Sequence, residues 1–351
     1  MTADPFRTTD FEYELPTELI AQEPPPDRGG SRLLIVHRSA PGARSDPALE
    51  DAQFGDLARL IPAGDLLVLN TTRVRHARLL GTRPSGAPAE LLLIHPAGAD
   101  TWVAMGKPGS ALRPGKQIVL GTGASVETLE VLPDGNRIVR FVGISPEAAM
   151  QRFGQLPLPP YISRDPNAVD EERYQTVYAA AEGSVAAPTA GLHFTPALID
   201  RLSSSGVFIE GLDLQVGPGT FKPVEVDDPR QHEMHPERYE ISTRLVQVLE
   251  RVRSAGGRVW AVGTTVVRAL ESAALPNGAV RGGSGETSLM IMPGYSFRVV
   301  DRLITNFHLP RSTLLMLVCA FAGRELVLRA YRHAVEERYR FYSYGDAMVV
   351  I

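Results

Sequence analysis

The chain has 351 residues, of which 44% are hydrophobic and 22% are charged, and its formal net charge at pH 7 is −4. This composition is typical of a folded protein of one large or two moderate domains, and it excludes a disordered chain. The acidic balance argues against nucleic-acid binding through overall charge but leaves room for a local basic patch. The apolar stretches 63–69 and 314–322 are too short to span a bilayer, and the single cysteine, Cys319, fits a reducing cytoplasm.

A short apolar run at 32–38 predicts a buried strand near the start of the chain. Helical spacing follows at 54–61 and ends at Pro62 and Gly64, and a second strand is predicted at 65–70. A strand, a helix and another strand in this order indicate the beginning of an α/β domain.

The pattern changes between residues 73 and 142, where six short apolar runs are separated by turns rich in Gly and Pro. The runs are 74–80, 89–94, 101–105, 117–120, 126–132 and 137–142. Evenly spaced short strands with no helix between them are typical of a small antiparallel sheet or barrel. We therefore predict a β-barrel domain, residues 72–150, inserted into an α/β domain formed by residues 1–71 and 151–351.

Helices and strands alternate through the rest of the chain. Helical spacing predicts helices at 146–153, 196–204, 242–255, 265–274, 312–321 and 324–337. Apolar runs predict strands at 207–216, 258–263, 289–292, 299–305 and 347–351. This alternation favours a layered α/β domain.

Two familiar motifs are incomplete in this sequence. Pro114 stands where the second glycine of a phosphate-binding P-loop belongs. Pro236 occupies the position of the second histidine of the zinc-protease motif that His232 and Glu233 begin, and it would break the helix. We expect no metal site.

Three polar turns between predicted elements remain as candidate sites. Small residues at 185–194 would let a ligand approach the backbone, although this segment also reads as a tight turn beside a packed His193. The turn at 262–265 leads from a strand into a helix and suits hydroxyl or anion contacts, and such turns are also plain connections. His308, in the turn 306–310, is either a general base or a structural hydrogen-bonding group.

Many uncommon strings occur in one order over nearly the whole chain. They lie at 11–16, 19–22, 64–74, 156–162, 172–178, 186–194, 216–221, 234–237, 261–268, 305–310, 312–318, 320–323 and 344–348. In these strings the chain resembles the S-adenosylmethionine:tRNA ribosyltransferase-isomerases of queuosine biosynthesis. The resemblance implies an α/β domain interrupted by a small β-barrel, which agrees with the change of pattern at residue 73.

The resemblance also implies the reaction and its partners. The ribosyl portion of S-adenosylmethionine is transferred to 7-aminomethyl-7-deazaguanine in tRNA and isomerised, which forms epoxyqueuosine and releases adenine and methionine. S-adenosylmethionine is a substrate, and no further cofactor is expected. We expect a monomer, with a homodimer as the alternative.

A base can start this reaction, because the sulfonium makes the neighbouring C5′ protons acidic, and a proton source must serve the leaving adenine. The resemblance implies that the catalytic residues are among His193, His308, His235, Asp346 and Glu271. The implied substrate-binding residues are Thr189, Gly191, Gly217, Gly219, Thr220, Thr264, Thr265, Arg268 and Asn306.

Arginine supplies nearly all the positive charge, since Lys107, Lys116 and Lys222 are the only lysines. Anticodon-arm phosphates are expected to contact arginines near the start of the β module and beside the segment 156–162, while a tyrosine stacks on a base. These candidates are Arg73, Arg75, Arg78, Arg164, Arg173, Tyr161 and Tyr174. The alternative is a solvated surface of arginines.

Three residues depart from the family's usual pattern. Gln215 stands where His is expected, Thr71 replaces an Asn, and Val266 replaces a Ser or Thr. Glutamine donates a hydrogen bond but does not shuttle protons near neutral pH, so we expect Gln215 to orient substrate. Two other functions stay open, namely a paralogue that modifies a free deazapurine nucleoside or another small amine, and a catalytically silent RNA-binding protein.

Overall fold

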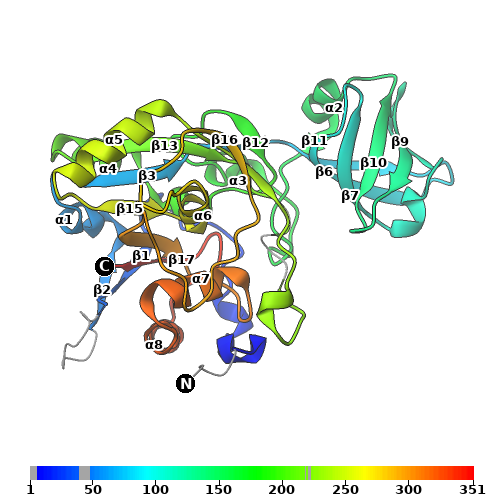
Figure 1. Ribbon diagram of the computed structural model, residues 1–351. Coiled ribbons are helices and arrows are strands. Elements are labelled where there is room, and N and C mark those ends of the chain that lie inside the picture. The colour runs from blue at the N-terminus through cyan, green and yellow to red at the C-terminus, as the bar shows by residue number, and fades with distance from the viewer. Residues whose placement is uncertain (1–5, 39–47, 218, 220–222) are drawn as a thin grey trace.

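Nine strands form one mixed sheet in the computed structural model, which describes residues 6–38, 48–217, 219 and 223–351. They are β1 (Arg32–Val36), β2 (Leu49–Gln53), β3 (Leu66–Asn70), β13 (Phe208–Leu214), β14 (Glu237–Ile241), β15 (Val259–Val262), β16 (Gly283–Thr287), β17 (Arg302–Asn306) and β18 (Ala347–Val350). Their order is β16-β14-β13-β3-β15-β17-β18-β1-β2 (Figure 1). The central strands β13, β3, β15 and β17 are mutually parallel.

Helices cover both faces of this sheet (Figure 1). They are α1 (Leu57–Leu60), α4 (Pro196–Ser204), α5 (Thr243–Ser254), α6 (Thr264–Ser272), α7 (Thr313–Ala322) and α8 (Arg324–Glu336). A further short helix, α3 (Ala168–Arg173), contributes to neither core of this sheet. Successive residues of a strand point to opposite faces, so β3 serves two cores. Leu66 and Val68 pack in the core that contains α5 to α8, whereas Leu67 and Leu69 pack with α1 and α4. Burial on both faces explains the unbroken apolar run of β3.

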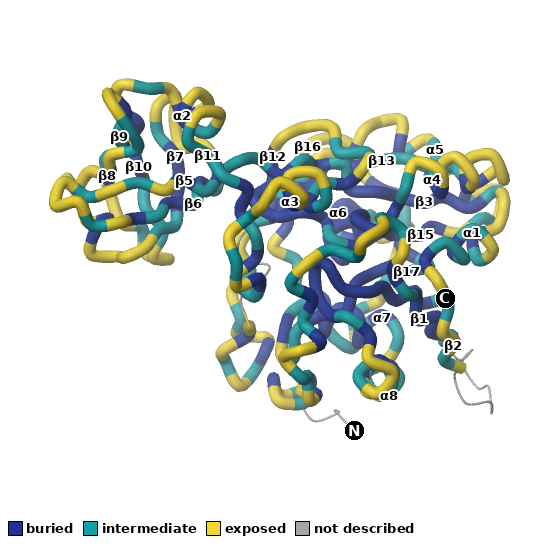
Figure 2. The backbone as a smooth tube through the Cα atoms, turned by 180° about the vertical axis from the view of Figure 1, so that it is seen from behind, coloured by how far each residue is buried: buried dark blue, intermediate teal, exposed yellow. Residues whose placement is uncertain are grey.

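Seven strands form a second, antiparallel sheet that stands apart from the main body (Figure 2). They are β5 (Arg78–Thr82), β6 (Pro88–Pro96), β7 (Thr101–Lys107), β8 (Gln117–Gly121), β9 (Ala124–Val131), β10 (Arg137–Val142) and β11 (Gly154–Gln155). Their order is β11-β5-β6-β7-β10-β9-β8, and a further pairing between Thr82 and Val119 joins β5 to β8. The second sheet has a core of its own, which includes Leu91, Trp102 and Phe141 and packs against α2 (Pro146–Phe153).

Short elements complete the described chain. A parallel pair, β4 (Arg73–Val74) and β12 (Glu182–Ser184), lies where the chain passes between the two sheets. The 3-10 helices are η1 (Thr8–Phe11), η2 (Thr17–Leu19), η3 (Phe54–Asp56), η4 (Gly109–Leu112), η5 (Thr189–His193) and η7 (Pro229–Gln231). Within the described ranges we find no helix with the length and apolar character that crossing a membrane requires.

The predicted α/β class is confirmed, and each of the six evenly spaced apolar runs contributes to one of the strands β5 to β10. The strand predicted at 289–292 is wrong. The Leu289 N–H donates to Thr287 Oγ1 at 3.1 Å, and the Leu289 carbonyl accepts from Arg268 Nε at 3.1 Å. These side-chain partners take the backbone groups that a strand would need, and the edge strand β16 ends just before them.

Candidate functional site

A cavity lies at the carboxyl ends of β15 and β17, the edge of a parallel sheet where α/β proteins commonly bind ligands. Gly263 turns the chain from β15 into α6 with φ of 90°, a conformation that favours glycine. The lining residues are Tyr161, Ala187, Pro188, Thr189, Ala190, Val216, Gly263, Thr264, Thr265, Thr305, Asn306, His308, Leu309, Ser312, Leu314 and Tyr342. Among these described lining residues there is no Asp, Glu, Lys or Arg.

Three residues that line this cavity each carry a buried polar atom with no hydrogen-bond partner among the described residues. These atoms are Asn306 Oδ1, Thr265 Oγ1 and the Tyr342 hydroxyl. Most buried polar groups in proteins are paired, and leaving one unpaired costs about 1–3 kcal/mol. Three such atoms around one cavity indicate a site built to bind a polar, uncharged group.

The Asn306 side chain is fixed by its neighbours. Its Nδ2 donates to the Tyr342 carbonyl at 2.9 Å and to His193 Nε2 at 3.1 Å. Because a carbonyl only accepts, Nδ2 must be the nitrogen, and Oδ1 is therefore the atom left without a partner. His193 Nδ1 in turn donates to Ser31 Oγ at 2.9 Å. Both ring nitrogens of His193 are thus occupied, so His193 acts as a positioning residue for Asn306.

His308 lines the cavity and has a nitrogen available. Its Nε2 bonds to Thr305 Oγ1 at 2.7 Å, and no described residue bonds to Nδ1. When Nε2–H donates to Thr305, the Nδ1 lone pair is free to accept a proton. Burial lowers the pKa of His308 to about 3 and that of His193 to about 4, so both rings are neutral near pH 7.

Both buried histidines should make the protein sensitive to acid. Below the ordinary histidine pKa of about 6.5, the unfolded chain takes up protons that the folded chain does not, so stability falls as the pH falls. Lowering the pH from about 6.5 to about 4.5 should remove about 2–3 kcal/mol of unfolding free energy for each histidine. Urea unfolding of the protein and of His308→Gln at both pH values measures this, and equal losses in the two proteins would contradict it.

The two candidate acids lie outside the cavity lining. The Glu271 carboxylate accepts from the backbone N–H groups of Arg298 at 2.9 Å and of Val299 and Val300 at 3.0 Å each. The Asp346 carboxylate accepts from the backbone N–H groups of two arginines, Arg32 and Arg340, at 2.8 Å each. Through these bonds, both carboxylates hold loops and strand ends in place.

Arg268 is likewise engaged within the protein. Its guanidinium forms a buried ion pair with Glu237, whose other oxygen accepts from the Gly217 N–H at 3.0 Å. The exposed ring of His235 packs against Gly219, where a Cβ would contact it. These residues hold the loop after β13 rather than line the cavity, and Thr220 lies outside the described residues.

Of the other predicted substrate-binding residues, some line the cavity and one is needed for close packing. Thr189, Thr264, Thr265 and Asn306 line the cavity, whereas a Cβ on Gly191 would overlap the Tyr178 hydroxyl. Gly191 is therefore needed for close packing. Gln215 also lies outside the lining, and its side chain packs against Gly183.

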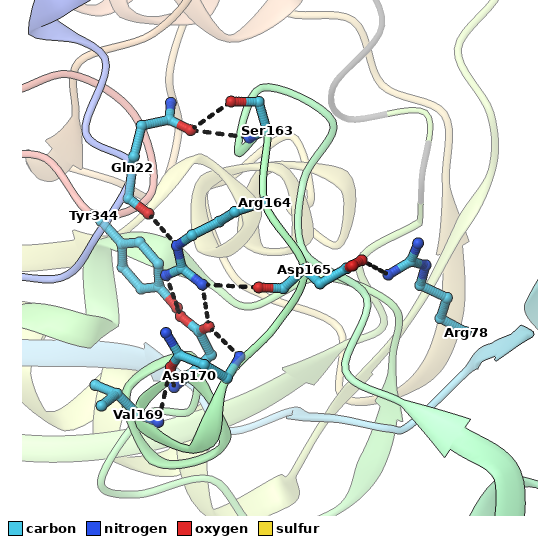
Figure 3. A network of polar contacts seen from close by, with 9 residues as sticks. Gln22, Arg78, Ser163, Arg164, Asp165, Val169, Asp170 and Tyr344 are labelled. Atoms are coloured by element: carbon cyan, nitrogen blue, oxygen red, sulfur yellow. Dashed lines mark hydrogen bonds and ion pairs between the residues drawn. The ribbon is translucent and has the colours of Figure 1, made fainter.

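Two of the candidate RNA-binding arginines are neutralised by carboxylates (Figure 3). Arg78 bonds to Glu90 at 3.1 Å and to Asp165 at 3.2 Å. Arg164 makes a two-point pair with Asp170 at 2.5 and 2.8 Å, and Asp170 also accepts from the Tyr344 hydroxyl at 2.7 Å. A phosphate would have to compete with these carboxylates for either arginine.

The remaining RNA-binding candidates are three arginines bonded to backbone carbonyls and two tyrosines, one buried and one in the cavity lining. Arg73, Arg75 and Arg173 donate to the backbone carbonyls of Ala179, Glu182 and Pro26, respectively. Tyr174 is fully buried and presents no ring face to a base. Tyr161 lines the cavity instead, with its ring 4.5 Å from that of Tyr342.

Tyr342 is a cavity residue that sequence reasoning missed. It adopts φ of 71°, which is uncommon outside glycine, and such backbone strain concentrates at functional sites. Its carbonyl fixes Asn306, and its hydroxyl is one of the three unpartnered atoms. The matched string at 344–348 begins two residues after it, so only proximity in sequence pointed to this residue.

An α/β fold with an uncharged polar cavity at the carboxyl ends of parallel strands is typical of enzymes that act on small organic substrates. Residues 8–350 match the family described as "Queuosine biosynthesis protein". The chain belongs to this family.

Curated relatives and solved structures match this chain, and those described here do so over nearly its full length. An S-adenosylmethionine:tRNA ribosyltransferase-isomerase of Symbiobacterium thermophilum is 51% identical over 349 residues, covering 98% of this chain and 100% of the relative. One of the same description from an Anaeromyxobacter species is also 51% identical, covering 98% and 99%. The crystal structure of S-adenosylmethionine tRNA ribosyltransferase from Thermotoga maritima has a TM-score of 0.56 at 37% identity, covering 97% of this chain and 100% of that one.

Proposed function

We propose that the chain transfers the ribosyl portion of S-adenosylmethionine to 7-aminomethyl-7-deazaguanine in tRNA and isomerises it. The products are epoxyqueuosine-tRNA, adenine and methionine. Membership of the queuosine biosynthesis family over residues 8–350 supports the reaction class. The observation that carries the assignment to this cavity is its set of three unpartnered polar atoms in an uncharged lining.

The lining suits the adenosyl part of S-adenosylmethionine. Ribose hydroxyls and purine nitrogens are neutral donors and acceptors, which match Asn306 Oδ1, Thr265 Oγ1 and the Tyr342 hydroxyl. The paired rings of Tyr161 and Tyr342 offer aromatic faces to a purine or to the sulfonium. The cavity volume is about 60 Å³, below the roughly 300–1,000 Å³ of ligand pockets, so the lining must open to admit the whole substrate.

His308 is the group we assign as the base. The C5′–H bond breaks, the proton moves to His308 Nδ1, and the electron pair stays on C5′ as a sulfonium ylide. Burial disfavours the imidazolium form of His308. In a dry cavity, however, the positive imidazolium would face the negative C5′ carbon, and their attraction offsets part of the cost of burying the charge. Elimination then opens the ribose, and adenine leaves with the proton that His308 took from C5′. The tRNA amine adds and gives up its proton, and epoxide closure breaks the C–S bond and releases methionine.

We assign residues 72–150 as an inserted β-barrel domain within an α/β domain of residues 1–71 and 151–351. The separate core of the second sheet and the pairing of Thr82 with Val119 support this division. A barrel closed in this way leaves few free strand edges, which limits unwanted pairing with other chains.

Product analysis tests the proposed function. The protein is incubated with S-adenosylmethionine and tRNA that carries the aminomethyl-deazaguanine, and epoxyqueuosine, adenine and methionine are expected. Release of S-adenosylhomocysteine would identify a methyltransferase instead. Equal turnover with the free nucleoside would favour the paralogue, and binding of tRNA without adenine release would favour a silent RNA-binding protein.

A further inference from the structure

We propose that one end of the second sheet binds the phosphate backbone of the tRNA substrate through Lys107, Arg113 and Lys116. We call this region the basic end and define it by Lys107 at the end of β7 and the loops 83–87, 108–116 and 132–136. The inference rests on the proposed function, because that function makes a tRNA the substrate.

Positive charge is concentrated in the part of the chain that forms this sheet. Residues 78–155, which span the second sheet, contain eight Lys and Arg against six Asp and Glu, whereas the whole chain contains 36 against 40. The remainder is therefore net negative. A polyanion is attracted to the positive region and repelled from the rest, so charge alone directs RNA toward the second sheet.

The strand registers bring the three cations to the same end of the sheet. Lys107, at the end of β7, lies opposite Glu90 near the start of β6. Thr82, at the end of β5, pairs with Val119 near the start of β8, and Lys116 immediately precedes β8. Because neighbouring strands run antiparallel, the loops after β5 and β7 emerge together.

The opposite end of the sheet has a different charge pattern. There Arg140 pairs across the sheet with Thr101, close to the loop that carries Asp100. Arg140 is also held in an ion pair with Glu127 at 2.6 Å. The loops of the basic end, taken with Lys107, carry one acid, Asp134, against four cations, namely Arg83, Lys107, Arg113 and Lys116. This end of the sheet therefore has a net positive charge.

The three cations are available to a ligand. Lys107, Arg113 and Lys116 are all exposed, and within the described part of the chain none of them forms an ion pair. Arg78 and Arg164, by contrast, already contact carboxylates. Phosphates therefore bind at the basic end without displacing an existing partner, which makes it a stronger candidate than the arginines expected from sequence.

A groove leads from the basic end toward the cavity. It has a volume of about 640 Å³ and lies between strands β5 to β7 and the segment 157–165, with Lys107 in its lining. Pro160 and Ile162 line this groove, while Tyr161 between them lines the cavity. RNA held by the basic end would thus place a nucleotide next to the wall of the S-adenosylmethionine site. The groove volume falls within the roughly 300–1,000 Å³ range of ligand pockets, enough for one unstacked base.

Salt-dependent tRNA binding tests the proposal. The triple variant Lys107→Gln, Arg113→Gln, Lys116→Gln should bind unmodified tRNA at least about tenfold more weakly at moderate salt. Each lost phosphate contact removes about 0.7–0.9 from the slope of log affinity against log salt, so the slope should fall by about two to three. Each single variant should lower it by about 0.7–0.9. These single changes on the protein surface keep the test interpretable if the triple variant folds poorly.

Arg140→Gln is the matched control, because it removes an exposed arginine from the same sheet at the opposite end. It should leave tRNA affinity and the salt slope unchanged, and all variants should bind S-adenosylmethionine like the wild type. Wild-type affinity and slope in the triple variant would overturn the inference while the proposed function stands. Failure of the wild-type protein to bind or modify tRNA would instead overturn the proposed function.

Discussion

Replacing His308 by glutamine should lower turnover by about a hundredfold or more, the range typical of a lost general base. Glutamine keeps a hydrogen-bonding group beside Thr305 but does not accept a proton near neutral pH. The direct readout is loss of deuterium from S-adenosylmethionine labelled at C5′. Exchange into solvent or product should slow with turnover, while the affinity for S-adenosylmethionine changes little.

His193→Gln provides the contrasting variant. Its ring nitrogens contact Ser31 and Asn306, so its loss should disturb the position of Asn306 and lower both stability and substrate affinity. Abstraction of the C5′ deuterium should persist once substrate is bound. If His308→Gln abstracts deuterium at the wild-type rate while His193→Gln does not, the two roles are reversed.

Periodicity predicted the elements whose burial is regular. The six strand runs of the second sheet and the amphipathic helices α5 and α8 each follow one period, so local sequence identified them. Strands β14 and β16 escaped prediction because they are short and carry polar residues such as Glu240 and Ser284. Their pairing partners, not their own composition, make them strands.

The candidate site was predicted only in part, because a side chain's role depends on distant neighbours. Thr265, Asn306 and His308 were expected in the site, and the structure places all three around one cavity. In the sequence, Glu271 cannot be distinguished from a catalytic acid. In the structure, its carboxylate accepts hydrogen bonds from backbone N–H groups of a loop 27 to 29 residues away. Arg78 is neutralised by Asp165, 87 residues along the chain. No pattern local to either residue carries that information.

Tyr342→Phe should weaken S-adenosylmethionine binding by about ten- to a hundredfold, because one hydrogen bond in a dry cavity contributes about 1–3 kcal/mol. The change removes only the hydroxyl. The ring contact with Tyr161 and the carbonyl bond to Asn306 are kept, and phenylalanine has the same backbone preferences at a φ of 71°. Calorimetric titration of the ligand measures the loss.

Tyr178→Phe is the matched control for this prediction. The Tyr178 hydroxyl is also buried without a partner among the described residues, but it packs against Gly191 outside the cavity. Removing an unpaired buried hydroxyl is neutral or stabilising for the free protein, so urea unfolding should show no loss of stability in either variant. Affinity should fall in Tyr342→Phe alone, since only that hydroxyl gains a partner when substrate binds. Equal affinities in the two variants would show that the Tyr342 hydroxyl is a packing feature and that the ligand takes its hydrogen bonds elsewhere.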